Sequence, residues 1–127
     1  MAKVHISTVL NSSENGITKY DGYGVLKDNR LTFYDDKIKV VIEYNNNTLN
    51  LERSNDEYRI VLPFEISLTK EGIYDIKCDS IQIPVKVTTN NLCIEDGLIH
   101  VEYSLLLGDT SQGDFVYDIE YEVSIWY

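Results

Sequence analysis

One histidine and several carboxylates occur in two stretches of the chain that both alternate polar with apolar residues. His100 and Glu102 lie in the first stretch, and Asp118, Glu120 and Glu122 lie in the second. If the two stretches pair as strands, these side chains share one face, and imidazole with carboxylates suits zinc or a harder divalent ion. A solvated strand face carries the same residue types, and the repulsion between facing carboxylates in water is only about 1 kcal/mol. We therefore expect a solvated face, with His100, Glu102, Glu120 and Glu122 as a weak candidate metal cluster.

A second candidate site combines one arginine with several tyrosines. Arg53 shares the alternation phase of Leu49 and Leu51, which predicts that it points towards the apolar side. A guanidinium there could hold a ligand carboxylate or phosphate bidentately. The reading that we favour is an arginine whose stem packs at a strand end while its charged head reaches water.

Four of the ten tyrosines fall on predicted inner faces, and with Arg53 they are the candidate ligand-binding residues: Tyr74, Tyr103, Tyr117 and Tyr121. Inward tyrosines combine a large apolar ring with a hydroxyl that needs a partner. They suit an amphipathic pocket, but bulky side chains also fill the interior of small barrels. The sequence favours a filled interior over an open pocket.

Catalytic motifs are lacking. The two histidines, His5 and His100, lie outside any recognisable motif, and the sequence holds no G-x-S-x-G, P-loop, G-x-G-x-x-G or H-E-x-x-H. The segment 108–114 (G-D-T-S-Q-G-D) lacks the ligand pattern of an EF-hand, so we expect it to be a hairpin loop. We expect no enzyme activity and no cofactor.

The elements that must carry these side chains are strands. Residues 115–127 alternate apolar with polar side chains throughout, and residues 98–107 do the same, which predicts two long strands with one buried face each. In the hairpin that we predict, Leu107 faces Phe115, which sets His100 opposite Glu122 on the outer face. Pairing odd with odd residues keeps both apolar faces on one side, which a slip of one residue would destroy.

The rest of the chain shows short alternating runs separated by turn residues, with Asn90-Asn91 among the predicted turns. Helical periodicity is nearly absent. We therefore predict an all-β fold in one domain spanning residues 1–127, an antiparallel closed or nearly closed barrel of about eight to ten strands. Cys78 and Cys93 alternate with apolar neighbours, so we expect both to be reduced and buried in the core.

Composition narrows the choice of partners. The formal net charge is −10 among 127 residues, which argues against nucleic acid and anionic membranes, since both need basic patches. Neither a membrane span nor a signal peptide is visible, so we expect a cytoplasmic protein.

Several segments together resemble the YwiB-like family of small bacterial barrels of lipocalin (calycin) type, which have no assigned function. They are L-T-F-Y-D-D (31–36), L-N-L-E-R-S (49–54), L-P-F (62–64), the stretch 74–91, G-L-I-H-V-E-Y-S-L-L-L-G-D (97–109) and V-Y-D-I-E-Y-E-V (116–123). The chain departs from the family at Ser80, where a glycine is usual, and in a shorter segment between Tyr34 and Val40. The resemblance implies a lipocalin-like barrel and, by analogy, an interior site.

Two functions stay open. The first is a barrel without catalytic activity that binds a small amphipathic ligand in or at its mouth. The second is a protein-interaction or structural module with a fully packed interior. An open cavity at Arg53 would favour the first, and a dry interior with apolar side chains outside would favour the second.

Overall fold

The computed structural model describes residues 1–126, which form ten strands and one short 3-10 helix. Tyr127, the last residue of the predicted final strand, lies outside the described residues. The elements are β1 (Ala2–Ser12), β2 (Gly16–Lys27), β3 (Arg30–Asp35), β4 (Ile38–Tyr44), β5 (Thr48–Ser54), β6 (Tyr58–Glu65), β7 (Thr69–Ile76), η1 (Lys77–Asp79), β8 (Ile81–Glu95), β9 (Leu98–Leu107) and β10 (Thr110–Trp126). In this part of the chain no helix is long and apolar enough to cross a membrane.

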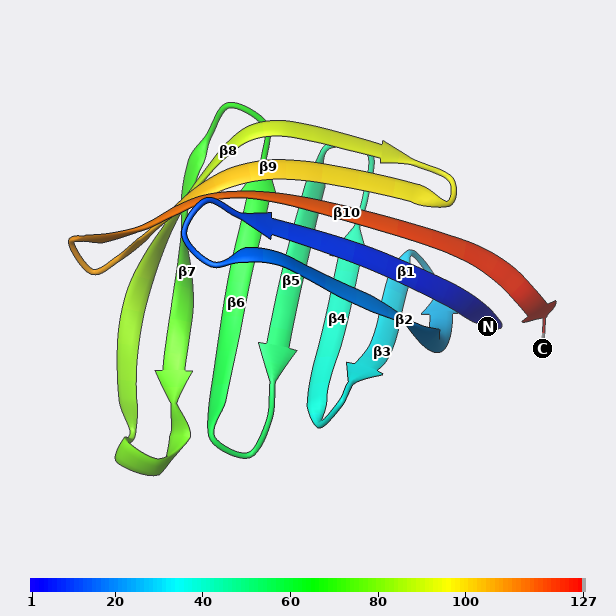
Figure 1. Cartoon of the computed structure of the whole chain (residues 1–127), viewed down its shortest axis with the longest axis horizontal. Helices are drawn as coiled ribbons and strands as arrows, with labels where there is room; N and C mark the ends of the chain where they lie inside the picture. Colours follow the sequence, from blue (N-terminus) through cyan, green and yellow to red (C-terminus); the bar gives the residue numbers. More distant parts are fainter. Residues whose placement is uncertain (127) are drawn as a thin grey trace.

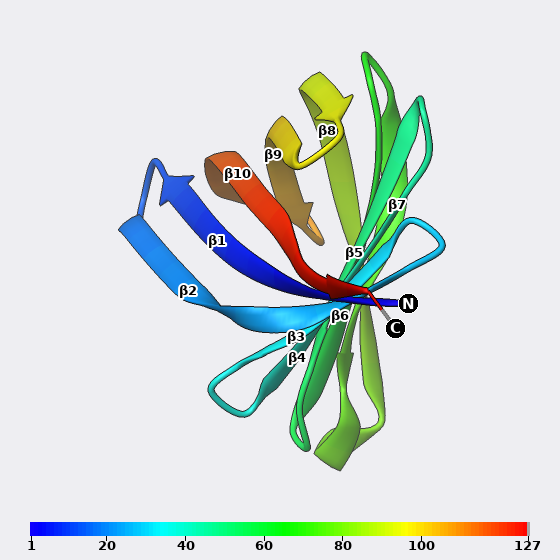
Figure 2. The same cartoon turned by 90° about the vertical axis from the view of Figure 1, so that its right-hand side faces the viewer.

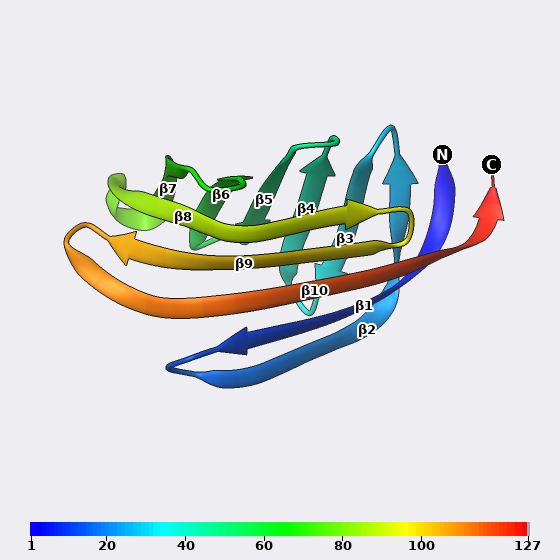
Figure 3. The same cartoon turned by 90° about the horizontal axis from the view of Figure 1, so that it is seen from above.

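All strand pairs are antiparallel, and the sheet closes into a barrel in the order β1-β10-β9-β8-β7-β6-β5-β4-β3-β2. The prediction of an all-β, lipocalin-like closed barrel is confirmed. Strands β3 to β7 form one layer, and the long strands β8, β9, β10, β1 and β2 cross it steeply (Figure 1). The view from above shows the long strands sweeping across the ends of the shorter ones (Figure 3).

Alternation along each strand produces the core. A cluster of buried apolar side chains fills the space between the layers and includes the fully buried Phe64, Ile6, Ile42 and Ile99. The final strand supplies Tyr117, Ile119 and Tyr121 to this cluster, as its period-two pattern predicts.

The register of the last hairpin differs from the predicted one. Tyr103 pairs with Phe115 and Ile99 with Ile119, so odd residues still face odd residues, but the pairing is displaced by four positions. The cause is the loop, which was predicted over residues 108–114 and is shorter in the structure. Only Gly108 and Asp109 lie between the strands, and Thr110 already pairs with Leu107. An irregularity between Ser111 and Gly113 then restores the odd-to-odd pairing.

Two other predictions about local structure are wrong. Cys78 and Cys93 are free thiols but exposed, because Cys78 lies in η1 and Cys93 faces outward from β8. Asn90-Asn91 is not a turn. The chain continues through it as one strand, and the ladder to β9 absorbs the extra residue as a register shift between Thr89 and Asn91.

Candidate functional site

The position of Arg53 defines one end of the barrel. Arg53 lies near the end of β5, facing inward in phase with Leu49 and Leu51, and 26% of its side chain is exposed. Its nearest described carboxylate is Asp35 at the end of β3, with Nη2 of Arg53 4.0 Å from Oδ2 of Asp35. That distance exceeds a hydrogen bond, so Asp35 balances part of the charge without occupying the guanidinium donors.

Two buried tyrosines lie close enough to Arg53 for its positive charge to lower the pKa of their hydroxyls. Tyr103 and Tyr117 are each 3% exposed, and burial raises the pKa of both hydroxyls. The positive charge of Arg53 opposes this rise in the pKa of both residues. Both therefore remain neutral hydroxyls at physiological pH, beside a permanent cation.

Partly buried apolar side chains lie beside Arg53 and its neighbours in the strand ladders. Ile60 faces Arg53 and Tyr74 faces Ile60, while Ile38 faces Asp35. Tyr74 stacks on Tyr58 with ring centroids 5.9 Å apart, and Phe115 stacks on Tyr103 at 5.0 Å. These rim side chains come from six strands: Leu10, Tyr20, Ile38, Ile60, Tyr74 and Phe115. We call Arg53, Asp35 and these six side chains the Arg53 end. It combines a partly exposed arginine with apolar neighbours, which is the chemistry of an amphipathic anion site.

Tyr121 lies at the opposite end. Strand β4 runs from Ile38 at the Arg53 end to Tyr44, and the Tyr44 and Tyr121 hydroxyls share a hydrogen bond of 2.6 Å. Burial raises the Tyr44 pKa, and the bond to Tyr121 adds to the rise. The structure therefore groups Tyr74, Tyr103 and Tyr117 with Arg53 and separates Tyr121 from them.

Of the Arg53 end, only Arg53 and Tyr74 were among the candidate ligand-binding residues, and the polar members that sequence reasoning missed are Asp35 and Tyr20. Asp35 continues the alternation of Leu31 and Phe33 and could have been recognised by that phase. Tyr20 follows a loop and precedes two glycines, so its pattern is weak. The structure stacks it on Phe33 at 4.9 Å.

Four hollows lie on the barrel, and one of about 330 Å³ is lined by Tyr20 of the Arg53 end with Thr8 and Lys19. The largest of the four, about 490 Å³, lies over the outer face of β1 and β10, beside the β8–β9 turn. A smaller one of about 220 Å³ lies beside Tyr44 and Tyr121. Neither of these, nor the two others of about 430 and 330 Å³, is lined by Arg53, Tyr74, Tyr103 or Tyr117. None of these four hollows therefore opens the barrel interior beside Arg53.

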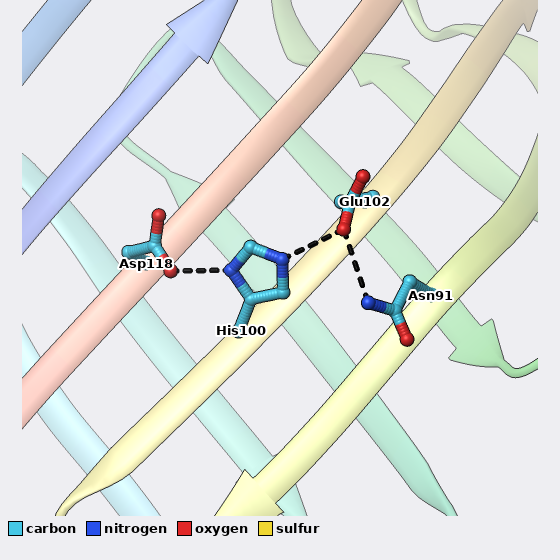
Figure 4. Close-up of polar contacts among 4 residues, drawn as sticks. All are labelled: Asn91, His100, Glu102 and Asp118. Carbon is cyan, nitrogen blue, oxygen red and sulfur yellow. Dashed lines mark hydrogen bonds and ion pairs between the residues drawn. The ribbon is translucent and has the colours of Figure 1, made fainter.

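The polar face of β8, β9 and β10 carries a network centred on His100 (Figure 4). Nδ1 of His100 lies 2.5 Å from Oδ1 of Asp118, and Nε2 lies 2.8 Å from Oε2 of Glu102. Asn91 donates to the same Glu102 oxygen from Nδ2 at 3.0 Å. Both ring nitrogens therefore face carboxylates, which favours the doubly protonated imidazolium.

The carboxylates set the titration of this network. The contact with Asp118, followed by that with Glu102, raises the His100 pKa above its ordinary 6.5. The folded state then holds the proton more tightly than the unfolded chain. The contribution of the protonated His100 to the stability of the folded protein is therefore present in full below pH 6.5 and is lost as the pH rises through the raised His100 pKa. The side chains are 30–43% exposed, so solvent screening keeps this contribution small.

The predicted metal cluster is divided by the true register. His100 faces Asp118 rather than Glu122, while Glu120 and Glu122 face Ser7 and His5 of β1 on the other side of β10. Among residues 1–126, no group of three or more histidine, cysteine, aspartate or glutamate side chains could hold a metal ion. This face is a hydrogen-bonded polar surface.

Comparison with known proteins agrees with the fold. The family described as "Domain of unknown function (DUF1934)" matches residues 6–119. The crystal structure of the YwiB protein from Bacillus subtilis superposes with a TM-score of 0.67 at 13% identity, over 97% of this chain and 91% of that one. At 13% identity, this similarity shows a shared fold and does not show a shared function. No curated protein sequence matches the chain.

Proposed function

Because the chain belongs to the DUF1934 family, a domain of unknown function, we propose a function from its own side chains: binding of a small amphipathic anion at the Arg53 end. The observation that carries the proposal is Arg53, whose side chain is 26% exposed beside apolar neighbours and 4.0 Å from its nearest described carboxylate. None of the four hollows in the barrel is lined by Arg53, so the proposed ligand sits on the barrel mouth rather than deep inside it.

Each part of the ligand has a counterpart at this end. A carboxylate or phosphate accepts hydrogen bonds from the guanidinium, which displaces the loose contact to Asp35. An apolar body of the ligand packs on Tyr74, Phe115 and their neighbours in the rim. No group at this end is arranged as a nucleophile with a base, so we propose binding without catalysis.

Two probes of equal chain length test the proposal, decanoate and decanol, each titrated by calorimetry. We expect the wild type to bind decanoate more tightly than decanol. In Arg53→Ala we expect decanoate affinity to fall by roughly 10- to 100-fold, since a hydrogen bond to a charged group contributes about 1.5–3 kcal/mol.

The matched control is Arg59→Ala, which removes an exposed arginine from the neighbouring strand β6, where it pairs with Glu52. That variant should bind decanoate as the wild type does. Wild-type protein that binds neither probe, or an Arg53→Ala variant with unchanged decanoate affinity, would refute the proposal.

A second candidate function, a protein-interaction module, is favoured by the criterion set from the sequence, because none of the four hollows is lined by Arg53 and apolar side chains lie outside the barrel. Val25 of β2 and Ile125 of β10 are exposed and both face Lys3 of β1, near the point where the two ends of the chain meet (Figure 2). The next residue, Trp126, is 70% exposed on the opposite face of β10. A partner that contacts this end of β10 would shift the fluorescence of Trp126, the single tryptophan, to shorter wavelength. A partner that binds the Trp126→Ala and Val25→Asp variants as tightly as it binds the wild type would contradict this function.

The two free thiols, Cys78 and Cys93, are exposed, which fits a reducing compartment, and we propose that the protein is cytoplasmic.

A further inference from the structure

Strand β2 is paired on both sides along only part of its length. Residues Gly24–Lys27 pair with β3, whereas all of Gly16–Leu26 pairs with β1. Before Gly24, over residues 16–23, β2 has no pairing with β3, and the β1–β2 hairpin stands away from β3 and β4 (Figure 2). Residues Gly16–Lys19 are exposed on both faces. The otherwise closed barrel therefore has an open strand edge at residues 16–23.

This edge is accessible without exposing the core. Tyr20 points inward and stacks on Phe33, and its ring lies along the strand where a side chain at Gly22 would be. The backbone N–H and C=O groups that would otherwise pair with β3 face outward. An edge of this kind is a template for another strand.

We propose that a second copy of this chain pairs with this edge, antiparallel, about a two-fold axis at Tyr20. This register sets Lys19 of each copy opposite Asp21 of the other, and Ile17 opposite Tyr23. Symmetry makes each contact occur twice, as in other isologous interfaces. Ile17 and Tyr23 are 62% and 58% exposed in the single chain, so both gain apolar cover.

Charge selects this register over its neighbours. A neighbouring register keeps the outward side chains of the two copies on the same face only if one strand moves by two residues along the other. Such a move sets either Lys19 opposite Lys19 or Asp21 opposite Asp21. Like charges directly opposite one another destabilise a strand pair. Asp21 also accepts hydrogen bonds within its own chain from His5 and Ser7 but keeps a 70% exposed side chain, so it can reach Lys19 of the second copy.

Sedimentation equilibrium over a range of protein concentrations tests the proposal at about physiological salt. We expect a dimer in the wild type, and about tenfold weaker association in Lys19→Asp and in Asp21→Lys, because two attractive pairs become repulsive. The double variant Lys19→Asp/Asp21→Lys reverses the pairs and should regain the wild-type association. Lys27→Asp, on the same strand outside the edge, is the control with equal charge change and should dimerise normally.

Hydrogen exchange of the wild type gives a readout that needs no variant to fold. Among residues 17–23, the alternate amides that point away from β1 should exchange more slowly as protein concentration rises. The proposal is overturned by a monomer at all concentrations, by a dimer whose amides at 17–23 exchange independently of concentration, or by a double variant that fails to recover. Protection of these amides in a monomeric protein would mean a different occupant and would also overturn it.

Discussion

Tyr103 offers the sharpest test of how the barrel is packed. Its ring lies between Phe64, at a centroid distance of 4.7 Å, and Phe115, at 5.0 Å with an interplanar angle of 10°. Replacing it by alanine removes both aromatic contacts from a site that is 3% exposed and leaves a cavity. Large-to-small aromatic changes in cores cost about 3–5 kcal/mol, and we expect Tyr103→Ala to fall in this range.

Tyr103→Phe isolates the hydroxyl. It keeps both ring contacts, so we expect the free energy of unfolding to change by less than about 1 kcal/mol. Comparing the two variants separates the packing of the ring from the chemistry of its polar end.

The assay is urea unfolding followed by circular dichroism, with the slope against denaturant checked for constancy across variants. A double-mutant cycle with Phe115→Leu measures the stacking itself, and we expect a coupling of about 0.5–1.5 kcal/mol. Tyr34→Ala, at a 60% exposed position on β3, is the control and should change stability by no more than about 0.5 kcal/mol. A loss below about 1 kcal/mol for Tyr103→Ala would refute the packing described here.

Three further predictions concern other elements. His100→Gln should destabilise the protein at pH 5.5 and progressively less as the pH rises through the raised His100 pKa, measured by urea unfolding at several pH values. A destabilisation that grows with pH would contradict the contact with Asp118. Thr89→Val should stabilise by about 1 kcal/mol in the same assay, because the buried Thr89 hydroxyl has no hydrogen-bond partner among the described residues. An unchanged or lower stability would indicate a partner for that hydroxyl. Gly72→Ala should lower the thermal midpoint by an amount equivalent to about 1–3 kcal/mol, because the added Cβ meets the Val61 carbonyl oxygen, and an unchanged midpoint would show that β6 can move aside.

The sequence by itself determined the class of fold and which face of most strands is buried. Period-two alternation depends only on neighbouring residues along one strand, so Val101, Tyr103, Tyr117 and Ile119 could be assigned to the core without knowing their partners. The same phase placed Arg53 on the inner side. The resemblance to the YwiB-like family, confirmed by the family match and the fold comparison, rested on these patterns.

The tertiary structure alone decided register, strand breaks and which candidate residues meet. A shift of four residues preserves the buried faces, so hydrophobic patterning cannot distinguish the predicted hairpin from the true one, in which His100 faces Asp118. The contact of Arg53 with Asp35 depends on the registers of β3, β4 and β5, and the contact of Tyr121 with Tyr44 depends on β10 and β4 facing each other across the closed barrel, so neither follows from local pattern. The open edge of β2 has the same origin, because whether a strand gains a second neighbour depends on where the sheet curves away from it.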